Sequence, residues 1–152
     1  MMHDVVLVCD GSAIGNPGPG GFAAILQAAG KELVLTGGHP ATTNNRMELM
    51  AAIEGLRALK TRCRVELVTD SQYVRNGITD WLPRWQANGW VAASGKPVLN
   101  QDLWHQLEEL VHEHEVNWSW TRGHTDDSTL QDRADELARQ SAREHAAALG
   151  GR

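Results

Sequence analysis

The stretch VVLVCDGSAIGNPGPGG, residues 5–21, opens with an apolar run that stops at an aspartate. A short run rich in Val and Leu is typical of a central strand whose two faces are both covered. Glycines and prolines follow Asp10 at once and predict a loop. This loop has neither the Lys-Ser/Thr pair nor the GxGxxG pattern of the common phosphate-binding loops. The role of the acid at its start has to come from elsewhere in the chain.

A second apolar run, RVELVTD at residues 64–70, also ends in an aspartate. If the two strands are parallel neighbours joined by a right-handed crossover, Asp10 and Asp70 emerge side by side at one edge of the sheet. Either aspartate alone is explained as well by a turn or by a helix cap, and Asp70 directly precedes a predicted helix. Two acids on neighbouring strands favour a shared site.

Patterns along the whole chain predict one α/β domain with a mixed sheet. Apolar spacing predicts strands at 4–10, 21–28, 31–38, 64–70 and 115–121. Helical spacing predicts helices at 44–60, 71–80, 81–88, 101–114 and 129–148. The second and third strands are expected to form a hairpin about Gly30.

Composition limits the classes of function. The chain has 152 residues, 41% of them hydrophobic, which suits a single domain with its own core. No apolar run has the length of a membrane span, and the N-terminus shows no secretory signal, so we expect no membrane partner. Cys9 and Cys63 match no metal or redox spacing and indicate free thiols in a reducing cytoplasm. The net charge of −5 by itself argues against a nucleic-acid partner.

Glu48 is a third acid in an unusual place. Within the helix predicted at 44–60 it shares a face with small residues that point to the core, among them Ala52 and Gly55. The competing interpretation is a cap, Asn45-x-x-Glu48, in which the carboxylate satisfies backbone donors of the first turn. The residues alone favour neither.

The last predicted helix offers two further acids. Asp132 shares a face with the charged residues Glu136 and Arg139, as a solvated position would. Asp135 instead lies at the border of the apolar stripe and aligns with Ala138, although it could also form an i,i+4 ion pair with Arg139. We therefore expect Asp135 to join the other acids, with Asp132 as the alternative.

Converging carboxylates need a positive partner, because like charges raise one another's pKa. These motifs contain no lysine, so a hard divalent cation is the simplest neutraliser, and oxygen ligands select Mg²⁺ or Mn²⁺ over zinc. Two such ions make the site positive despite the net charge of the chain and favour the binding of a phosphodiester.

Several motifs in order resemble ribonuclease HI, the type 1 ribonuclease H family. They are DGSAIGNPGPGG, TTNNRMELMAAIEGL, TDSQYV, the tryptophan-rich region 81–104 and WTRGHTDDSTLQDRADELA. The resemblance runs from about residue 4 to residue 145. It implies a single domain over 1–152, with a five-stranded mixed sheet whose second strand is antiparallel, flanked by helices. It also implies a handle at about 81–100 and a short C-terminal tail at about 146–152.

The implied activity is endonucleolytic hydrolysis of the RNA strand of an RNA–DNA hybrid by two metal ions, leaving 5′-phosphate and 3′-hydroxyl ends. Asp10, Glu48, Asp70 and Asp135 match the metal-binding acids of the family, Gly11 matches a position whose carbonyl lies near the metal, and His124 matches its mobile active-site histidine. The implied cofactor is Mg²⁺, with Mn²⁺ as a substitute. The implied protein is a cytoplasmic monomer whose partner is the hybrid.

The resemblance further implies a set of substrate-binding residues, which are mostly short amides and handle side chains: Asn16, Thr43, Asn44, Asn45, Gln72, Trp81, Arg84, Trp85 and Asn100. Such a duplex is read largely by shape and 2′-hydroxyls. For the amides, turn and cap chemistry is the competing role.

Two departures from the family pattern stand out. The last motif lacks the usual glycine and asparagine between the histidine and the final acid, and its loop is one residue longer. In the handle only Arg84 and Lys96 are basic, where many relatives carry a basic cluster. The alternatives are another metal-dependent nuclease of the same superfamily, or a non-catalytic module that binds hybrids.

Overall fold

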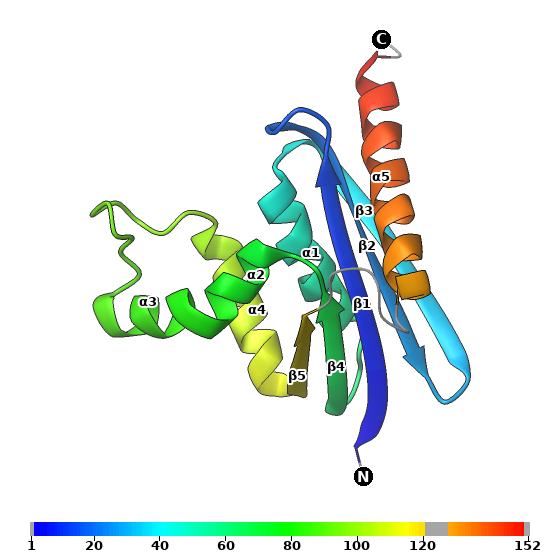
Figure 1. Ribbon diagram of the computed structural model, residues 1–152, viewed down its shortest axis with the longest axis horizontal. Helices are drawn as coiled ribbons and strands as arrows, with labels where there is room; N and C mark the ends of the chain where they lie inside the picture. The colour runs from blue at the N-terminus through cyan, green and yellow to red at the C-terminus, as the bar shows by residue number, and fades with distance from the viewer. Residues whose placement is uncertain (1, 121–127, 151–152) are drawn as a thin grey trace.

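The computed structural model describes residues 2–120 and 128–150. Its centre is a five-stranded sheet in the order β3-β2-β1-β4-β5 (Figure 1). The strands are β1 (His3–Ala13), β2 (Gly18–Ala28), β3 (Lys31–Thr42), β4 (Cys63–Thr69) and β5 (Glu115–Trp120). β2 runs antiparallel to both of its neighbours, whereas β1, β4 and β5 are parallel. The predicted fold, including the antiparallel second strand, is confirmed.

Helices cover the two faces of the sheet. On one face lies α5 (Ser128–Gly150), which packs small side chains such as Ala134 and Ala138 against Val8 and Ile25. On the other face lie α1 (Asn44–Arg57) and α4 (Gln101–Glu113), which bury Leu7 and Trp104 in the larger core (Figure 1). Each central strand is therefore covered on both sides, as its near-continuous apolar run predicts. No described helix is long and apolar enough to cross a membrane.

A helical arm projects from the sheet beyond β4 (Figure 1). It consists of α2 (Gln72–Asn76), a π-helical turn η1 (Gly77–Trp81) and α3 (Leu82–Asn88). The turn lies where the ring of Trp104 packs against Gly77, so closely that a Cβ on Gly77 would come within 2.0 Å of the ring. The helix predicted at 71–80 is confirmed, although its second half is a π-helical turn packed against Trp104 rather than α-helix.

The glycine-rich segment after Asp10 is mostly strand, and the predicted loop is wrong over much of its length. β1 continues to Ala13, and β2 begins at Gly18, so only residues 14–17 connect them. The glycines here make close tertiary contacts: a Cβ on Gly20 would lie 2.4 Å from Thr42 Cγ2 of β3, and a Cβ on Gly21, where the predicted strand starts, would lie 2.5 Å from the carbonyl oxygen of Ala138 in α5. Glycine is therefore used here for close approach of a strand to a helix rather than for a turn. The hairpin about Gly30 is confirmed, with Ala28 paired to Lys31.

Candidate active site

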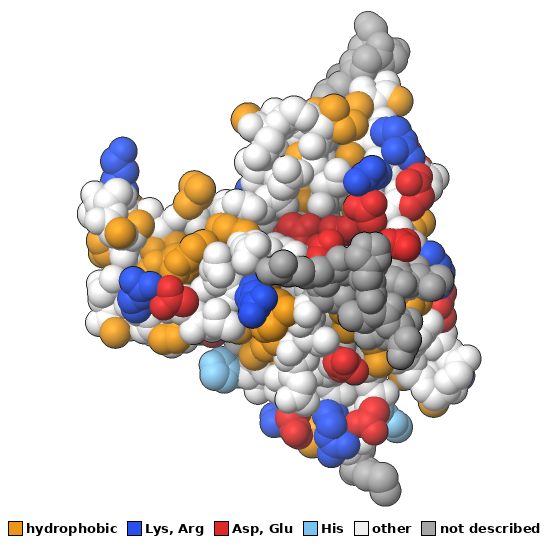
Figure 2. Space-filling model, in the orientation of Figure 1, with side chains coloured by type: hydrophobic (Ala, Val, Ile, Leu, Met, Phe, Trp, Pro, Cys, Tyr) orange, Lys and Arg blue, Asp and Glu red, His pale blue; other side chains and the backbone are white. Residues whose placement is uncertain are grey.

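Three of the predicted acids meet at the carboxyl end of the central strands. Asp10 comes from β1, Glu48 from the first turns of α1, and Asp70 directly follows β4. One ligand oxygen from each carboxylate lies within 4.8 Å of the other two. Figure 2 shows acidic side chains gathered near the centre of this face. The parallel register of β1 and β4 brings the two aspartates together, because their strands end at the same edge.

Gly11 allows α1 to approach β1 closely enough for Glu48 to reach this edge. A Cβ at position 11 would lie 2.4 Å from the backbone nitrogen of Glu48. The Gly11 N–H donates to Asp10 Oδ1 at 2.8 Å and to Glu48 Oε1 at 2.7 Å. The cap interpretation of Glu48 is not what the structure shows, because the helix is capped by Thr43, whose hydroxyl accepts from the Arg46 N–H.

The acid cluster carries unbalanced negative charge. Burial, helped by Asp70 and Asp135 and opposed by hydrogen bonds with Glu48 and the Gly11 N–H, raises the pKa of Asp10 to about 7. Burial also raises the pKa of Glu48 well above its usual value, helped by Asp10. Among the described residues Glu48 Oε2 has no hydrogen-bond partner although it is buried. An all-oxygen cluster with an orphaned buried oxygen fits a hard divalent cation such as Mg²⁺ or Mn²⁺.

Asp135 is the acid of α5 that faces this cluster. Burial raises the pKa of Asp70, and the charge of Asp135 raises it further. Asp135 also interacts with the carboxyl of Asp10. Its ion pair with Arg139, 3.2 Å between Nε and Oδ2, is present as well. Asp132 is exposed on the outer side of the helix, so the structure favours Asp135 over Asp132.

Asp70 does not cap the helix that follows it. The N-cap of α2 is Ser71, whose hydroxyl accepts from the Val74 N–H at 3.2 Å, so the Asp70 carboxylate is not the capping group. His124 lies outside the described residues.

The predicted substrate-binding amides fall into two groups. Asn16 and Asn44 brace the loop against α1: the Asn44 N–H donates to Asn16 Oδ1, and Asn44 Oδ1 accepts from the Ala13 N–H at 2.6 Å. Asn45 and Gln72 have no hydrogen-bond partner within the described part of the chain, and Gln72 is exposed. These two amides, one turn before Glu48 and two residues after Asp70, are available to a ligand.

Arg46 links the predicted phosphate contacts, and sequence reasoning missed it. Its guanidinium donates to Asn100 Oδ1 at 3.1 Å and forms a bidentate pair with Asp102. Asn100 in turn donates to the Tyr73 hydroxyl at 3.1 Å. Asn100 is therefore fixed between α1 and the arm. The one signal in the sequence is that Arg46 is the only base in TTNNRMEL.

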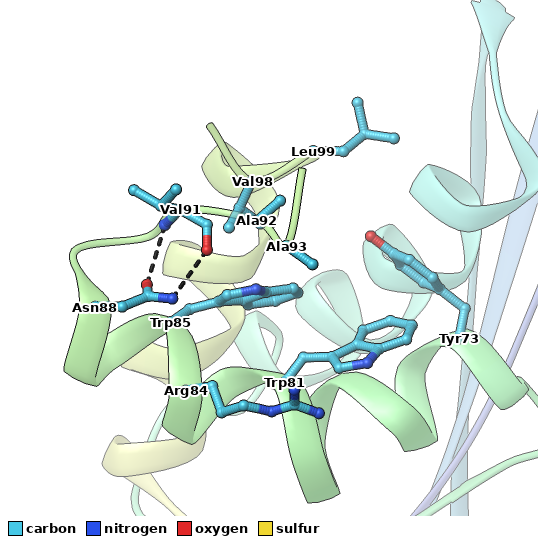
Figure 3. Close-up of a pocket in the computed structure, with 10 residues that line it drawn as sticks. All are labelled: Tyr73, Trp81, Arg84, Trp85, Asn88, Val91, Ala92, Ala93, Val98 and Leu99. Atoms are coloured by element: carbon cyan, nitrogen blue, oxygen red, sulfur yellow. Dashed lines mark hydrogen bonds between the residues drawn. The ribbon is translucent and has the colours of Figure 1, made fainter. Parts of the chain in front are cut away.

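The handle carries an aromatic pocket of about 380 Å³ (Figure 3). The rings of Tyr73, Trp81 and Trp85 line it, together with aliphatic side chains such as Leu99, which is 76% exposed. Its polar groups are already paired. Arg84 forms an ion pair with Asp80, and the amide of Asn88 both donates to and accepts from the backbone of Val91 (Figure 3).

Comparison with known proteins identifies relatives of the chain. The family model described as RNase H matches residues 2–143. "Ribonuclease H" from Solibacter usitatus is 53% identical over 143 residues, covering 94% of this chain and 97% of the relative. "Ribonuclease HI" from Pseudomonas aeruginosa strain PAO1 is 54% identical over 142 residues, covering 93% of this chain and 95% of the relative. The crystal structure of LC9-RNase H1, a type 1 RNase H with the type 2 active-site motif, superposes with a TM-score of 0.82 at 33% identity, covering 95% of this chain and 74% of that one.

Proposed function

The chain belongs to the ribonuclease H family, and from that premise we propose that it is the endonuclease that hydrolyses the RNA strand of RNA–DNA hybrids. The products are 5′-phosphate and 3′-hydroxyl ends. The observation that carries the proposal is the acid cluster, where three carboxylates lie within 4.8 Å and one buried oxygen has no partner among the described residues. A module that only binds hybrids has no need of such a costly arrangement.

The cofactor we propose is Mg²⁺, with Mn²⁺ as a substitute. Asp10, Glu48, Asp70 and Asp135 would hold it, together with the backbone carbonyl of Gly11. Two bound ions would supply an activated water and stabilise the charge on the leaving oxygen. Asp10 and Glu48, whose pKa values are raised, would release protons when cations bind. The same cations reverse the sign of the site and let a chain of net charge −5 accept a phosphodiester.

Substrate contacts fall on the surface between the acids and the handle. Asn45 and Gln72 contact the minor groove on either side of the scissile phosphate, while Asn16 and Asn44 shape the loop beside them. Thr43 and Asn100 contact phosphates of the DNA strand, with Asn100 oriented by Arg46. Trp81, Arg84 and Trp85 present the handle to the same strand.

We assign proton transfer or product release to His124 on the motif RGHTDDS, in which an imidazole exchanges protons near neutral pH. We also propose that the protein is a cytoplasmic monomer. Two buried free cysteines, Cys9 and Cys63, support the reducing compartment.

One experiment tests the activity. Labelled RNA–DNA hybrid, duplex DNA and duplex RNA are each incubated with Mg²⁺, Mn²⁺ or EDTA. Cleavage of the RNA strand of the hybrid alone, abolished by EDTA, is the expected result. Cleavage of duplex DNA would instead identify another nuclease of the superfamily. Tight hybrid binding in Ca²⁺ without cleavage under any condition would indicate a non-catalytic module.

A further inference from the structure

Gln131 is a buried amide that joins α5 to β1 beside the acid cluster. Its side chain is 3% exposed, and its Nε2 donates to the carbonyl oxygen of Cys9 at 3.1 Å. The parallel pairing of β1 with β4 ends at Val8 and Val68, so Cys9 is the first residue of β1 beyond that ladder. Gln131 therefore provides a donor at the point where the two strands stop pairing, one residue before Asp10.

The same side chain contributes poorly to stability. Within the described part of the chain Gln131 Oε1 is buried and has no hydrogen-bond partner. A buried polar atom without a partner destabilises the folded state, and an apolar side chain of the same length would avoid that cost. A residue that breaks a rule of packing at the edge of a functional site points to a role in geometry rather than in stability.

Asp135 lies between two fixed points of α5. Gln131 is one turn before it on the helix, bonded to Cys9. Three residues after Asp135, the backbone of Ala138 lies against Gly21 so closely that a Cβ there would come within 2.5 Å of it. A further link in this part of the helix, the ion pair of Arg133 with Glu32 on β3, is exposed, and exposed ion pairs contribute little to stability.

We propose that Gln131 is a positioning residue: it fixes how closely the first turns of α5 lie against β1, so that Asp135 faces Asp10 and Asp70. This inference rests on the proposed function, because it assigns Gln131 to the same metal site. It also accounts for a departure in the last motif: the usual asparagine is absent, and Gln131 supplies a side-chain amide in that stretch. A residue that orients a metal ligand from behind typically changes metal affinity or activity by about 10- to 100-fold when it is removed.

The test compares Gln131→Met, which keeps the length and removes the amide, with Gln131→Asn, which keeps the amide and shortens its reach. Gln140→Met is the matched control, because Gln140 is an exposed glutamine on the same helix. Arg133→Met removes the exposed link between α5 and β3. For each variant Tm is measured in EDTA and during a Mg²⁺ titration, and kcat and KM are measured on the hybrid at saturating Mg²⁺.

For Gln131→Met we expect Tm in EDTA close to that of the wild type, because loss of the bond to the Cys9 carbonyl offsets removal of the unpaired Oε1. We expect the Mg²⁺ concentration for half of the Tm rise to increase by about 10-fold or more, and kcat to fall by a similar factor with KM unchanged. Gln131→Asn should lie between Gln131→Met and the wild type, and both controls should match the wild type in Mg²⁺ response and kcat.

Wild-type Mg²⁺ response and kcat in Gln131→Met would overturn the proposal. So would an equal loss of kcat in Arg133→Met, since any loosening of the helix would then suffice. If Gln131→Met does not fold, wild-type values in Gln131→Asn would overturn it. The Mg²⁺-dependent Tm needs no substrate, so this inference can fail while the wild type still cleaves hybrid, and the proposed function can fail while Gln131 still governs metal binding.

Discussion

The acid cluster and the handle differ in how completely each satisfies its own polar groups. In the acid cluster Glu48 Oε2 is buried and has no partner among the described residues, and burial together with neighbouring charge raises the pKa values of Asp10 and Glu48. In the handle Arg84 is paired with Asp80, the Asn88 amide bonds to Val91, and the rings of Trp81 and Trp85 lie 5.9 Å apart in a packed aromatic group. The handle is complete as a structure without a ligand, whereas the acid cluster is not.

This difference separates residues that do chemistry from residues that present a surface. Repulsion between carboxylates destabilises the folded state. A bound cation relieves this repulsion, so cation binding should stabilise the fold. A packed aromatic arm gains nothing comparable from a cation. Equivalent substitutions in the two regions should therefore have very different consequences for activity.

The largest effect is expected from removing one charge of the cluster. Asp70→Asn keeps the shape of the side chain and removes a ligand, so kcat in Mg²⁺ should fall by about 1000-fold, the equivalent of several kcal/mol of charge stabilisation. Tm in EDTA should hold or rise. The matched change in the handle is Asp80→Asn, which removes the partner of Arg84. Activity there should stay within about 2-fold, because exposed pairs contribute little. Full activity of Asp70→Asn would contradict the metal mechanism.

A second comparison lies within α5. Asp135→Asn should lower kcat by about 10- to 100-fold at saturating Mg²⁺, while Asp132→Asn should leave it within about 2-fold. The reason is that Asp135 interacts with Asp10 and Asp70, whereas Asp132 is exposed on the outer face. Steady-state kinetics on the hybrid measures both. The reverse order would show that the metal site uses a different face of the helix.

The pH dependence of stability distinguishes the two regions without any substrate. The folded pKa of Asp10 is about 7 against 3.8 for the free group, so the folded state binds more protons between these values. The free energy of unfolding in EDTA should then fall by about 2–4 kcal/mol as pH rises from 4 to 7. Asp10→Asn should flatten this decline, and Mg²⁺ should offset it at pH 7.

Denaturant unfolding in EDTA at several pH values measures this effect. Asp80→Asn, in the handle, should show the same slope as the wild type. If the wild-type protein in EDTA were as stable at pH 7 as at pH 4, the repulsion in the cluster would be absent, and the electrostatic argument for the cation would lose its basis.

The acid cluster could be predicted largely from sequence, because its main determinants are local. Two Val- and Leu-rich runs that each end in an aspartate place their acids at one edge of the sheet if the strands are parallel neighbours, and β1 and β4 are. Helical facing then separates Asp135 from Asp132. The contact between Gly11 and Glu48 joins distant parts of the chain, so the sequence alone does not decide between a metal ligand and a cap at Glu48.

The handle was less predictable, because its details depend on contacts between elements. The π-helical turn at 77–81 follows from the ring of Trp104, which comes from α4. Gln86 donates to Glu108 across two helices, and no periodicity in the sequence indicates that pairing. The strand residues Gly18–Gly20 were missed for the same reason, since the local preference of glycine for turns is overridden by close contacts such as that between Gly20 and Thr42 of β3.

The smallest effect concerns how the handle binds nucleic acid. Each phosphate contact by a Lys or Arg adds roughly 0.7–0.9 to the slope of log K against log salt. Arg84 and Lys96 are the only bases between residues 81 and 100, and Arg84 is paired with Asp80, so the wild-type slope should be shallow. Gln86 and Asn88 are unsuitable for added charge, because Gln86 is hydrogen-bonded to Glu108 and Asn88 to the backbone of Val91.

Ala93 and Leu99 are exposed and line the aromatic pocket. Replacing both, as Ala93→Lys with Leu99→Lys, therefore places positive charge on the surface that Trp81 and Trp85 present. This variant should bind hybrid more tightly in Ca²⁺ with a slope steeper by up to about 1.8, and kcat at saturating hybrid should not change. Ala87→Lys adds charge to the handle away from the pocket and should steepen the slope less. An unchanged slope in the double lysine variant would mean that the handle only packs its tryptophans, and that the acid cluster and its neighbouring amides bind the hybrid alone.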